Sequence, residues 1–239
     1  MELIVLGHNG PYPGPDGGAC SGYLVRAGEQ CILLDCGSGV LSRLQRRADV
    51  TDLTAVVLSH LHGDHMADML VLRYALSQNN ADIVPVYTPD QPEGEYWVLS
   101  QSNAFETTPI VEGQAYHLGD VTLEFAPMTH PVLAYAVKIT HEGRTLVYSG
   151  DTTYNEVLPK FAHRANLLVC DSAFSEATHY EKAPHASAKQ AAIMAHQAHA
   201  KRLLLTHFKH DVDTDTLLAE AKSEFRHVAV AQQNLTIQV

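Results

Sequence analysis

The stretch LSHLHGDHMAD, from Leu58 to Asp68, directly follows the apolar run TAVV, which is typical of a buried strand. It carries four polar residues between positions 60 and 65, namely His60, His62, Asp64 and His65. Alternate side chains of extended backbone point to the same side, so the rings of His60 and His62 share one face. Imidazole nitrogens and carboxylate oxygens suit Zn²⁺, and also Fe or Mn. The stretch predicts a metal site at a strand's end, whereas a set of exposed turn histidines would require this spacing to arise by chance.

The remaining sequence indicates a globular protein. Of 239 residues, 46% are hydrophobic and 18% are charged, which is enough to bury a core and excludes a disordered chain. No linker, low-complexity segment or charge block interrupts it. We therefore predict a single domain over residues 1–239.

Charge and composition also limit partners and location. The formal net charge of −11 disfavours nucleic acid as a partner, because nucleic acid is itself polyanionic. The N-terminal MELIVLG lacks the features of a signal peptide, and no run of 18 apolar residues occurs, so we expect a cytoplasmic protein without a membrane span. In that compartment the four cysteines should be reduced, and we expect them to be buried as small hydrophobic residues. They are Cys20, Cys31, Cys36 and Cys170.

Short runs rich in Val, Ile and Leu alternate with helical patterns, which favours an α/β fold with mixed sheets. The expected strands are LIVLG, GYLVRA, CILLDCG, TAVVLSH, IVPVYTP, VTLEFAP, AYAVKIT, TLVYSGD, NLLVCDS, RLLLTHF and LTIQV. The expected helices are SGVLSRLQRR with Ser38 as N-cap, MADMLVLRYALSQ, and ASAKQAAIMAHQAHA, whose spaced alanines predict close packing on a sheet. The Gly- and Pro-rich segment 8–22 is expected to be a surface loop at the rim of a site.

HxHxDH after an apolar strand resembles the metallo-β-lactamase superfamily, and the resemblance covers nearly the whole chain. It implies an αββα sandwich of two mixed sheets flanked by helices. It also implies three later ligands, each after an apolar strand: His130 in PMTHP, Asp151 in YSGDT and His207 in LLLTHF. The implied first metal is held by His60, His62 and His130, the second by Asp64, His65 and His207, and Asp151 bridges both.

Two divalent cations about 3.5–4 Å apart can share a water molecule and lower its pKa toward about 7. The resulting hydroxide attacks an electrophilic phosphorus or carbonyl, while the cations stabilise charge on the substrate oxygen. Asp64 can bind a metal and also orient this nucleophile. We expect two divalent ions, with Zn²⁺ first and Mn or Fe also suited to the ligand set.

The segment HASAKQAAIMAHQAHAKRLLLTHF, residues 185–208, resembles the ribonuclease Z-like branch of that superfamily. By this resemblance His185 lies beside the metals and stabilises phosphoryl oxygens or protonates the leaving oxygen. The alternative is a purely structural hydrogen bond at a helix N-terminus. NLLVCDSAF also looks like that branch, with Asp171 in place of its glutamate.

The chain departs from transfer-RNA-processing ribonuclease Z in one main respect. That enzyme carries a long basic arm between its third metal histidine and its bridging aspartate, whereas the segment from His130 to Asp151 has room only for two strands and a turn. The chain looks more like the compact, armless bacterial hydrolases of the branch. We therefore predict a phosphodiesterase acting on small, including cyclic-nucleotide, phosphodiesters.

Several alternatives remain open. Within enzymes they are an acyl hydrolase of lactones or thioesters and a tRNA 3′-processing endonuclease, and outside hydrolases a di-iron redox protein or a non-catalytic metal-binding protein. The aromatic residues Tyr96, Trp97 and Phe105 either line a lid that stacks a nucleobase or form the core of a short helix. Family resemblance alone points to a homodimer.

Overall fold

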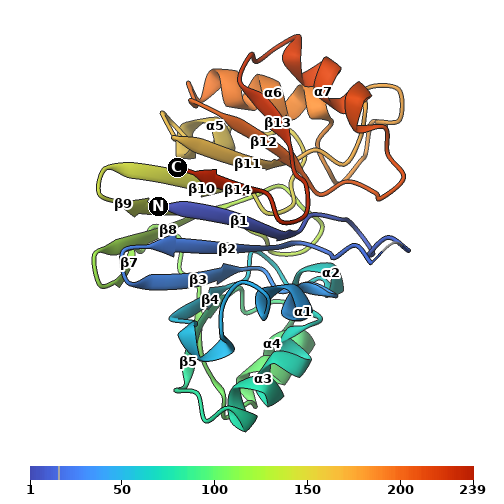
Figure 1. The fold of residues 1–239 in the computed structure, drawn as a ribbon. Helices are drawn as coiled ribbons and strands as arrows, with labels where there is room; N and C mark the ends of the chain where they lie inside the picture. Colours follow the sequence, from blue (N-terminus) through green and yellow to red (C-terminus); the bar gives the residue numbers. More distant parts are fainter. Residues whose placement is uncertain (16) are drawn as a thin grey trace.

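The computed structural model describes residues 1–15 and 17–239. In that part of the chain two seven-stranded sheets pack face to face (Figure 1). In spatial order the first sheet consists of β14 (Thr236–Gln238), β1 (Glu2–Gly7), β2 (Gly22–Ala27), β3 (Gln30–Leu34), β4 (Ala55–Val57), β5 (Val84–Thr88) and β6 (Phe105–Pro109). The second consists of β13 (Val228–Val230), β12 (Leu203–Thr206), β11 (Leu167–Asp171), β10 (Arg144–Tyr148), β9 (Tyr135–His141), β8 (Val121–Pro127) and β7 (Tyr116–Leu118).

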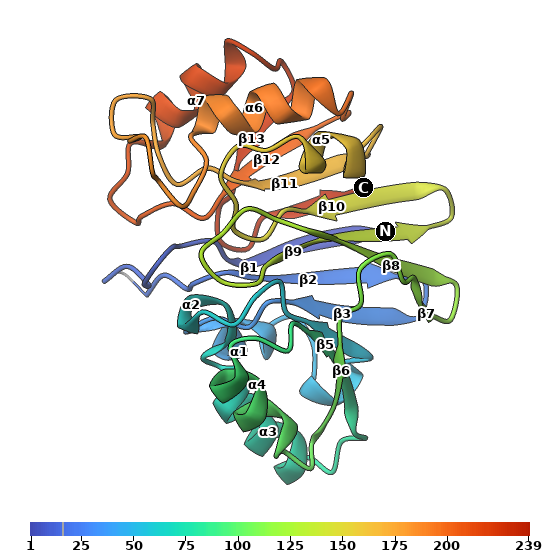
Figure 2. The same cartoon turned by 180° about the vertical axis from the view of Figure 1, so that it is seen from behind.

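Helices cover the outer face of each sheet, as the two opposite views show (Figures 1 and 2). Those on the first sheet are α1 (Val40–Leu44), α2 (Gly63–Met66), α3 (Met69–Gln78) and α4 (Glu93–Ser100), with a 3₁₀ turn at Val50–Asp52. Those on the second are α5 (Val157–Phe161), α6 (Ala188–Gln197) and α7 (Thr214–Lys222). The predicted αββα sandwich of mixed sheets is confirmed. No helix in residues 1–15 and 17–239 is long and apolar enough to cross a membrane.

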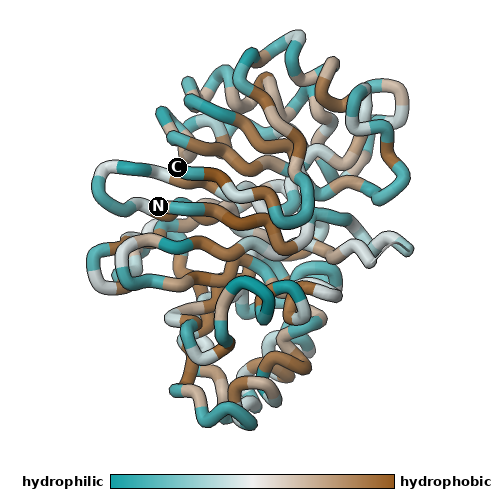
Figure 3. Tube along the Cα trace, in the orientation of Figure 1, coloured by the Kyte–Doolittle hydropathy of each residue, from teal (hydrophilic) through white to brown (hydrophobic). Residues whose placement is uncertain are grey.

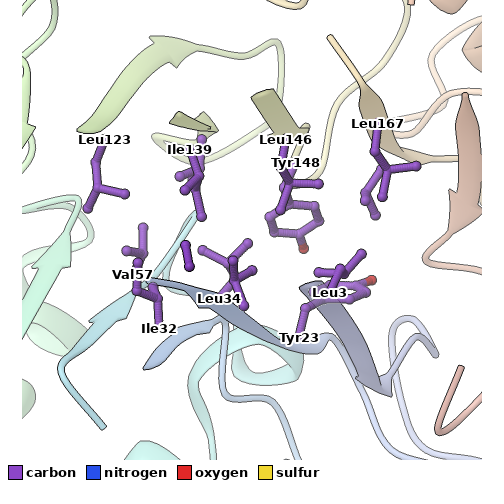
Figure 4. Packing of buried hydrophobic residues seen from close by; sticks show 14 of the residues in the cluster. Leu3, Tyr23, Ile32, Leu34, Val57, Leu123, Ile139, Leu146, Tyr148 and Leu167 are labelled. Carbon is purple, nitrogen blue, oxygen red and sulfur yellow. The ribbon is translucent and has the colours of Figure 1, made fainter. Parts of the chain in front are cut away.

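The main core lies between the two sheets. Side chains of alternate residues, such as Leu34 and Val57 on the first sheet, point towards Ile139 and Leu146 on the second (Figure 4). All four are fully buried. Hydrophobic colour follows the strands, whereas the turns between them are hydrophilic (Figure 3). Removal of this apolar surface from water is the dominant favourable term in forming the sandwich.

The helix α6 packs closely on the second sheet, as its alanine spacing predicted. Ala188, Ala191 and Ala195 are fully buried. Ser187 begins the helix as its N-cap and forms a capping box with Gln190, which satisfies backbone donors that the helix leaves free at its first turn. The cap fixes the point at which the chain leaves the loop that carries His185.

Strand directions determine where the site forms. Strands β10, β11 and β12 run parallel, and β8 has the same direction because both β8 and β10 are antiparallel to β9. Strands β3 and β4 are likewise parallel in the first sheet. Their carboxyl ends meet at the edge of the sandwich that carries α2 (Figure 1). Loops at carboxyl ends of parallel strands are where α/β proteins place ligands.

Some local predictions were wrong. Ser38 is not the N-cap of α1, because Gly39, whose φ of 86° suits glycine, occupies that position without a side-chain cap. The helix expected at residues 66–78 begins earlier and is divided into α2 and α3. Strands β6, β7 and β13 were not predicted: β7 and β13 have only three residues each, and β6, FETTP, has polar residues at three of its five positions.

Candidate metal centre

The structure brings together all seven residues for which a metal-binding role was predicted. They follow the carboxyl ends of four strands: His60 and His62 after β4, with Asp64 and His65 in α2; His130 after β8; Asp151 after β10; and His207 after β12. They form two groups in which one ligand atom from each residue lies within 4.8 Å of the others. The groups are His60, His62, His130 and Asp151, and Asp64, His65, Asp151 and His207.

Three imidazoles and a carboxylate form the first group. The His62 Nδ1 atom lies 3.1 Å from His60 Nε2 and 3.1 Å from His130 Nε2. Asp151 Oδ2 is 3.5 Å from His60 Nε2. Ring nitrogens that converge at this spacing surround one point, which is the arrangement that a cation needs from neutral imidazoles.

The second group shares Asp151 with the first. Asp151 Oδ1 lies 3.2 Å from His65 Nε2 and 3.3 Å from His207 Nδ1. Asp64 Oδ2 is 3.7 Å from His65 Nε2. One carboxylate oxygen of Asp151 therefore faces each group, as a bridging residue requires.

Two buried atoms in this cluster have no hydrogen-bond partner in the described part of the chain. They are His65 Nε2 and Asp151 Oδ1, which face each other across the second group. A buried polar atom without a partner costs about 1–3 kcal/mol, so native structures rarely leave one. A divalent cation bound by this donor set would satisfy both atoms, and the residues present therefore fit a metal centre.

His65 and His130 are each held through the ring nitrogen that faces away from the cluster. Asp35 is the main support: its Oδ2 accepts from His65 Nδ1 at 2.7 Å and from the Tyr148 hydroxyl at 2.7 Å. The backbone N–H and the hydroxyl of Ser59 also donate to Asp35, at 2.7 and 2.8 Å. His130 Nδ1 donates to the carbonyl oxygen of Pro184 at 3.3 Å, which leaves Nε2 as a lone-pair donor.

Asp35 was not predicted as a site residue. It is fully buried and has a φ of 54°, a left-handed conformation that costs a non-glycine residue energy. His207 shares this conformation, with a φ of 61°. The one signal in the sequence was a charged residue closing the apolar run CILLD, at the strand next to the one that precedes HxHxDH.

The electrostatics of the cluster favour cation binding. Burial lowers the pKa of His130 and of His207 to about 4, and it lowers the pKa of His60 well below its usual value. These rings are therefore neutral at pH 7 and have lone pairs to donate. Burial also acts on His65, but the carboxylates of Asp151 and Asp35 outweigh it and raise the pKa of His65. Carboxylates that attract a proton there attract a divalent cation in the same way.

His185 lies beside both groups, as predicted. Its ring stacks on that of His207 with centroids 4.9 Å apart, and its Nδ1 is 3.8 Å from Asp151 Oδ2. Nδ1 is hydrogen-bonded to Asp171 Oδ2 at 2.8 Å. Burial opposes the charged ring, but the Asp171 and Asp151 carboxylates outweigh burial and raise the pKa of His185 to about 9. One ligand atom each of Asp151, Asp171 and His185 also lies within 4.8 Å of the others, although Asp171 and His185 already bind each other.

The aromatic residues of the segment before His130 do not line this site. Phe105 is buried under the first sheet, and Tyr96 packs partly against the same cluster. Trp97 lies on α4 with 62% of its surface exposed. The structure therefore supports a core role for Phe105 and Tyr96 and gives Trp97 neither role. The four cysteines are buried and free, as expected.

Comparisons with known proteins give the family. Residues 30–208 match the family described as "Beta-lactamase superfamily domain". The chain is 34% identical over 230 residues to the probable metallo-hydrolase YhfI of Bacillus subtilis (strain 168), covering 94% of each chain. The chain belongs to the β-lactamase superfamily. The similarity to YhfI places the chain among the metallo-hydrolases of that superfamily.

Other superfamily members are similar in structure or sequence. The crystal structure of the metallo-beta-lactamase fold protein YhfI from Bacillus subtilis has a TM-score of 0.94 at 32% identity, covering 99% of each chain. The ribonuclease Z of Mycobacterium bovis (strain BCG / Pasteur 1173P2) is 29% identical over 247 residues, covering 87% of this chain and 86% of that one. A diphosphatase from the PhnP family shares the fold, with a TM-score of 0.80 at 17% identity over 100% of this chain and 97% of that one. The predicted likeness to ribonuclease Z is thus confirmed.

Proposed function

We propose that this superfamily member is a two-metal hydrolase of small phosphodiesters, including cyclic nucleotides. The observation that carries the proposal is Asp151, whose two carboxylate oxygens face two separate ligand groups. The first ion would be held by His60, His62 and His130, and the second by Asp64, His65 and His207, with Asp151 between them. Zn²⁺ suits this mixed nitrogen and oxygen donor set best, and Mn or Fe would also fit it.

Two divalent ions bound there supply charge stabilisation for the phosphoryl oxygens and lower the pKa of water at neutral pH. The chain's own residues supply orientation and a proton. Asp64, only 9% exposed on its side chain, can bind through one oxygen and accept a hydrogen bond from the attacking water through the other. His185 keeps its proton at neutral pH, and with Nδ1 bound to Asp171 it has Nε2 free to protonate the leaving oxygen.

Size and charge support a small substrate over tRNA. Strands β9 and β10 are joined by a tight turn at Glu142–Gly143, so the described chain has no arm between His130 and Asp151. A net charge of −11 also disfavours a long polyanion. The similarity to a ribonuclease Z supports the tRNA alternative, and hydrolysis of lactones or thioesters is a third candidate on the same two-metal scaffold.

The test combines metal content with turnover. The protein is loaded with Zn²⁺ or Mn²⁺, its metals are counted by elemental analysis, and bis-p-nitrophenyl phosphate, 2′,3′-cyclic nucleotides, a lactone, a thioester and an unprocessed tRNA are assayed side by side. We expect about two ions per chain and phosphodiester turnover that Asp64→Ala abolishes. Metal without phosphodiester turnover would overturn the proposal in favour of acyl hydrolysis, and clean tRNA cleavage would overturn the preference for small substrates.

A further inference from the structure

A hollow of about 520 Å³ opens directly beside the candidate metal centre. His62 and Asp64 are among its lining residues, so a phosphodiester held at the metal groups would extend its substituent into this space. The volume falls in the range of small-molecule sites, about 300–1,000 Å³. The remaining lining residues come from the loop after β1, from the start of α1 and from α2: Pro11, Tyr12, Pro13, Cys20, Ser38, Gly63 and Ala67.

Tyr12 is the single aromatic ring among these lining residues. Half of its surface, 50%, is exposed. The ring of His210 lies beside it, tilted, at 5.8 Å between centroids. Pro11 and Pro13 flank it, and the fixed φ of proline restrains the backbone on both sides. A half-exposed aromatic ring on a restrained loop thus lines the same hollow as His62 and Asp64.

The residues that line the hollow indicate which chemical group would bind beside Tyr12. No lysine or arginine lines this hollow, so it offers nothing to a second phosphate. Apart from His62 and Asp64 its polar side chains are the Ser38 hydroxyl, the Tyr12 phenol and the Cys20 thiol, whose pKa burial raises to about 12 and which is therefore neutral. A neutral, planar group with a few hydrogen-bonding atoms matches these walls. A nucleobase has that character, and every base has a face that can stack on an aromatic ring.

We propose that Tyr12 is the specificity residue that stacks the base of a mononucleotide-sized phosphodiester whose phosphate lies at His62 and Asp64. This inference rests on the proposed phosphodiesterase function and names the substrate class within it. It assigns base stacking to the loop after β1, since Trp97 and Phe105, the residues first considered for that role, lie away from the hollow.

The kinetic test uses two substrates that share the reacting group: 2′,3′-cyclic AMP and ribose 2′,3′-cyclic phosphate, which lacks the base. Tyr12→Ala should raise KM for cyclic AMP about tenfold with kcat nearly unchanged, because stacking on a base is lost equally from ground and transition state. The KM for the ribose compound should not move. Tyr12→Phe should resemble the wild type, and Tyr74→Ala, at a tyrosine on α3 that is 60% exposed, is the matched control.

A binding measurement separates this inference from the proposed function. In saturation-transfer difference NMR with adenosine and the metal-free protein, we expect the H2 and H8 protons of the base to receive saturation, and this signal to be lost in Tyr12→Ala but kept in Tyr12→Phe. If the wild type hydrolyses neither cyclic phosphate, the proposed function fails while the adenosine signal still tests Tyr12. If Tyr12→Ala keeps the adenosine signal, or raises KM for both substrates alike, the assignment of Tyr12 to base stacking is wrong.

Discussion

The two halves of the chain build the candidate metal centre in different ways. The first half supplies His60, His62, Asp64 and His65 from one strand end and the first turn of α2, within six consecutive positions. The second half supplies His130, Asp151 and His207 one at a time, each after a different strand of the second sheet. A contiguous motif needs only local backbone geometry to converge, whereas the scattered residues converge only when the whole parallel sheet has formed.

Asp151, which the two ligand groups share, should be the most sensitive residue of the site. Asp151→Asn removes the carboxylate that faces both ligand groups, while the HxHxDH motif stays intact. We expect loss of both ions rather than one, and a fall in kcat of about 10³-fold or more, since each ion provides several kcal/mol of charge stabilisation. Elemental analysis after dialysis, beside initial rates, measures both effects. Retention of one full ion per chain would mean that the two ligand groups bind metal independently.

His185 also comes from the second half of the chain, but it is a member of neither of the two predicted ligand groups. It therefore tests a role other than metal binding. His185→Ala should lower kcat about 10²-fold or more on substrates with an alkoxide leaving group, and far less when the leaving group is p-nitrophenolate, which needs no proton. Its pKa of about 9 means that the proton is held below that pH, so the wild-type rate on alkoxide substrates should fall as pH rises through about 9.

This alkaline fall should be absent in His185→Ala, which pH–rate profiles on both substrate types would show. His163→Ala, at an exposed histidine after α5, provides the control. An equal loss on both kinds of leaving group would assign His185 a structural role instead.

The same contrast explains how much the sequence predicts. Most strands of the sandwich and the alanine face of α6 were predicted from their periodicity, and His60, His62, Asp64 and His65 from their position after an apolar run. The spacing within HxHxDH by itself indicates that its side chains converge on one place. His130, Asp151 and His207 are ordinary loop residues taken singly, and only the family resemblance ordered them.

What the sequence did not predict depends on packing between distant segments. Asp35 contacts His65, Ser59 and Tyr148 through tertiary structure alone, and nothing in CILLDCG distinguishes it from a strand-ending turn residue. For the same reason the sequence left open whether Tyr96, Trp97 and Phe105 line the pocket or the core, and the structure places Phe105 and Tyr96 in the core. Trp97 has a suitable side chain, but the helix that carries it does not line the hollow. The loop that carries Tyr12 was predicted to lie at the rim of a site, but Tyr12 itself was not singled out.

A substitution at Asp35 tests whether HxHxDH binds metal without support from residues outside the motif. Asp35→Asn should weaken metal binding about 10- to 100-fold, the usual effect of removing a carboxylate that orients a ligating histidine. The loss should fall on the group that contains His65, so one ion should become weaker than the other in a competition titration with a chelator. Asp120→Asn, which disturbs an Asp–His pair at 3.0 Å with His141, is the matched control and should leave both affinities unchanged.

A pair of glycines gives the smallest and most discriminating comparison. A Cβ on Gly10 would lie 2.3 Å from the Nε2 atom of His207, whereas a Cβ on Gly63, inside HxHxDH, would meet nothing within 4 Å. Gly10→Ala should therefore displace the His207 ring and weaken the second ion about tenfold, the low end for a supporting residue. Gly63→Ala should leave metal content unchanged although it alters the motif itself. The opposite ranking in a metal titration would mean that the backbone of the motif, rather than the loop packed on His207, limits the site.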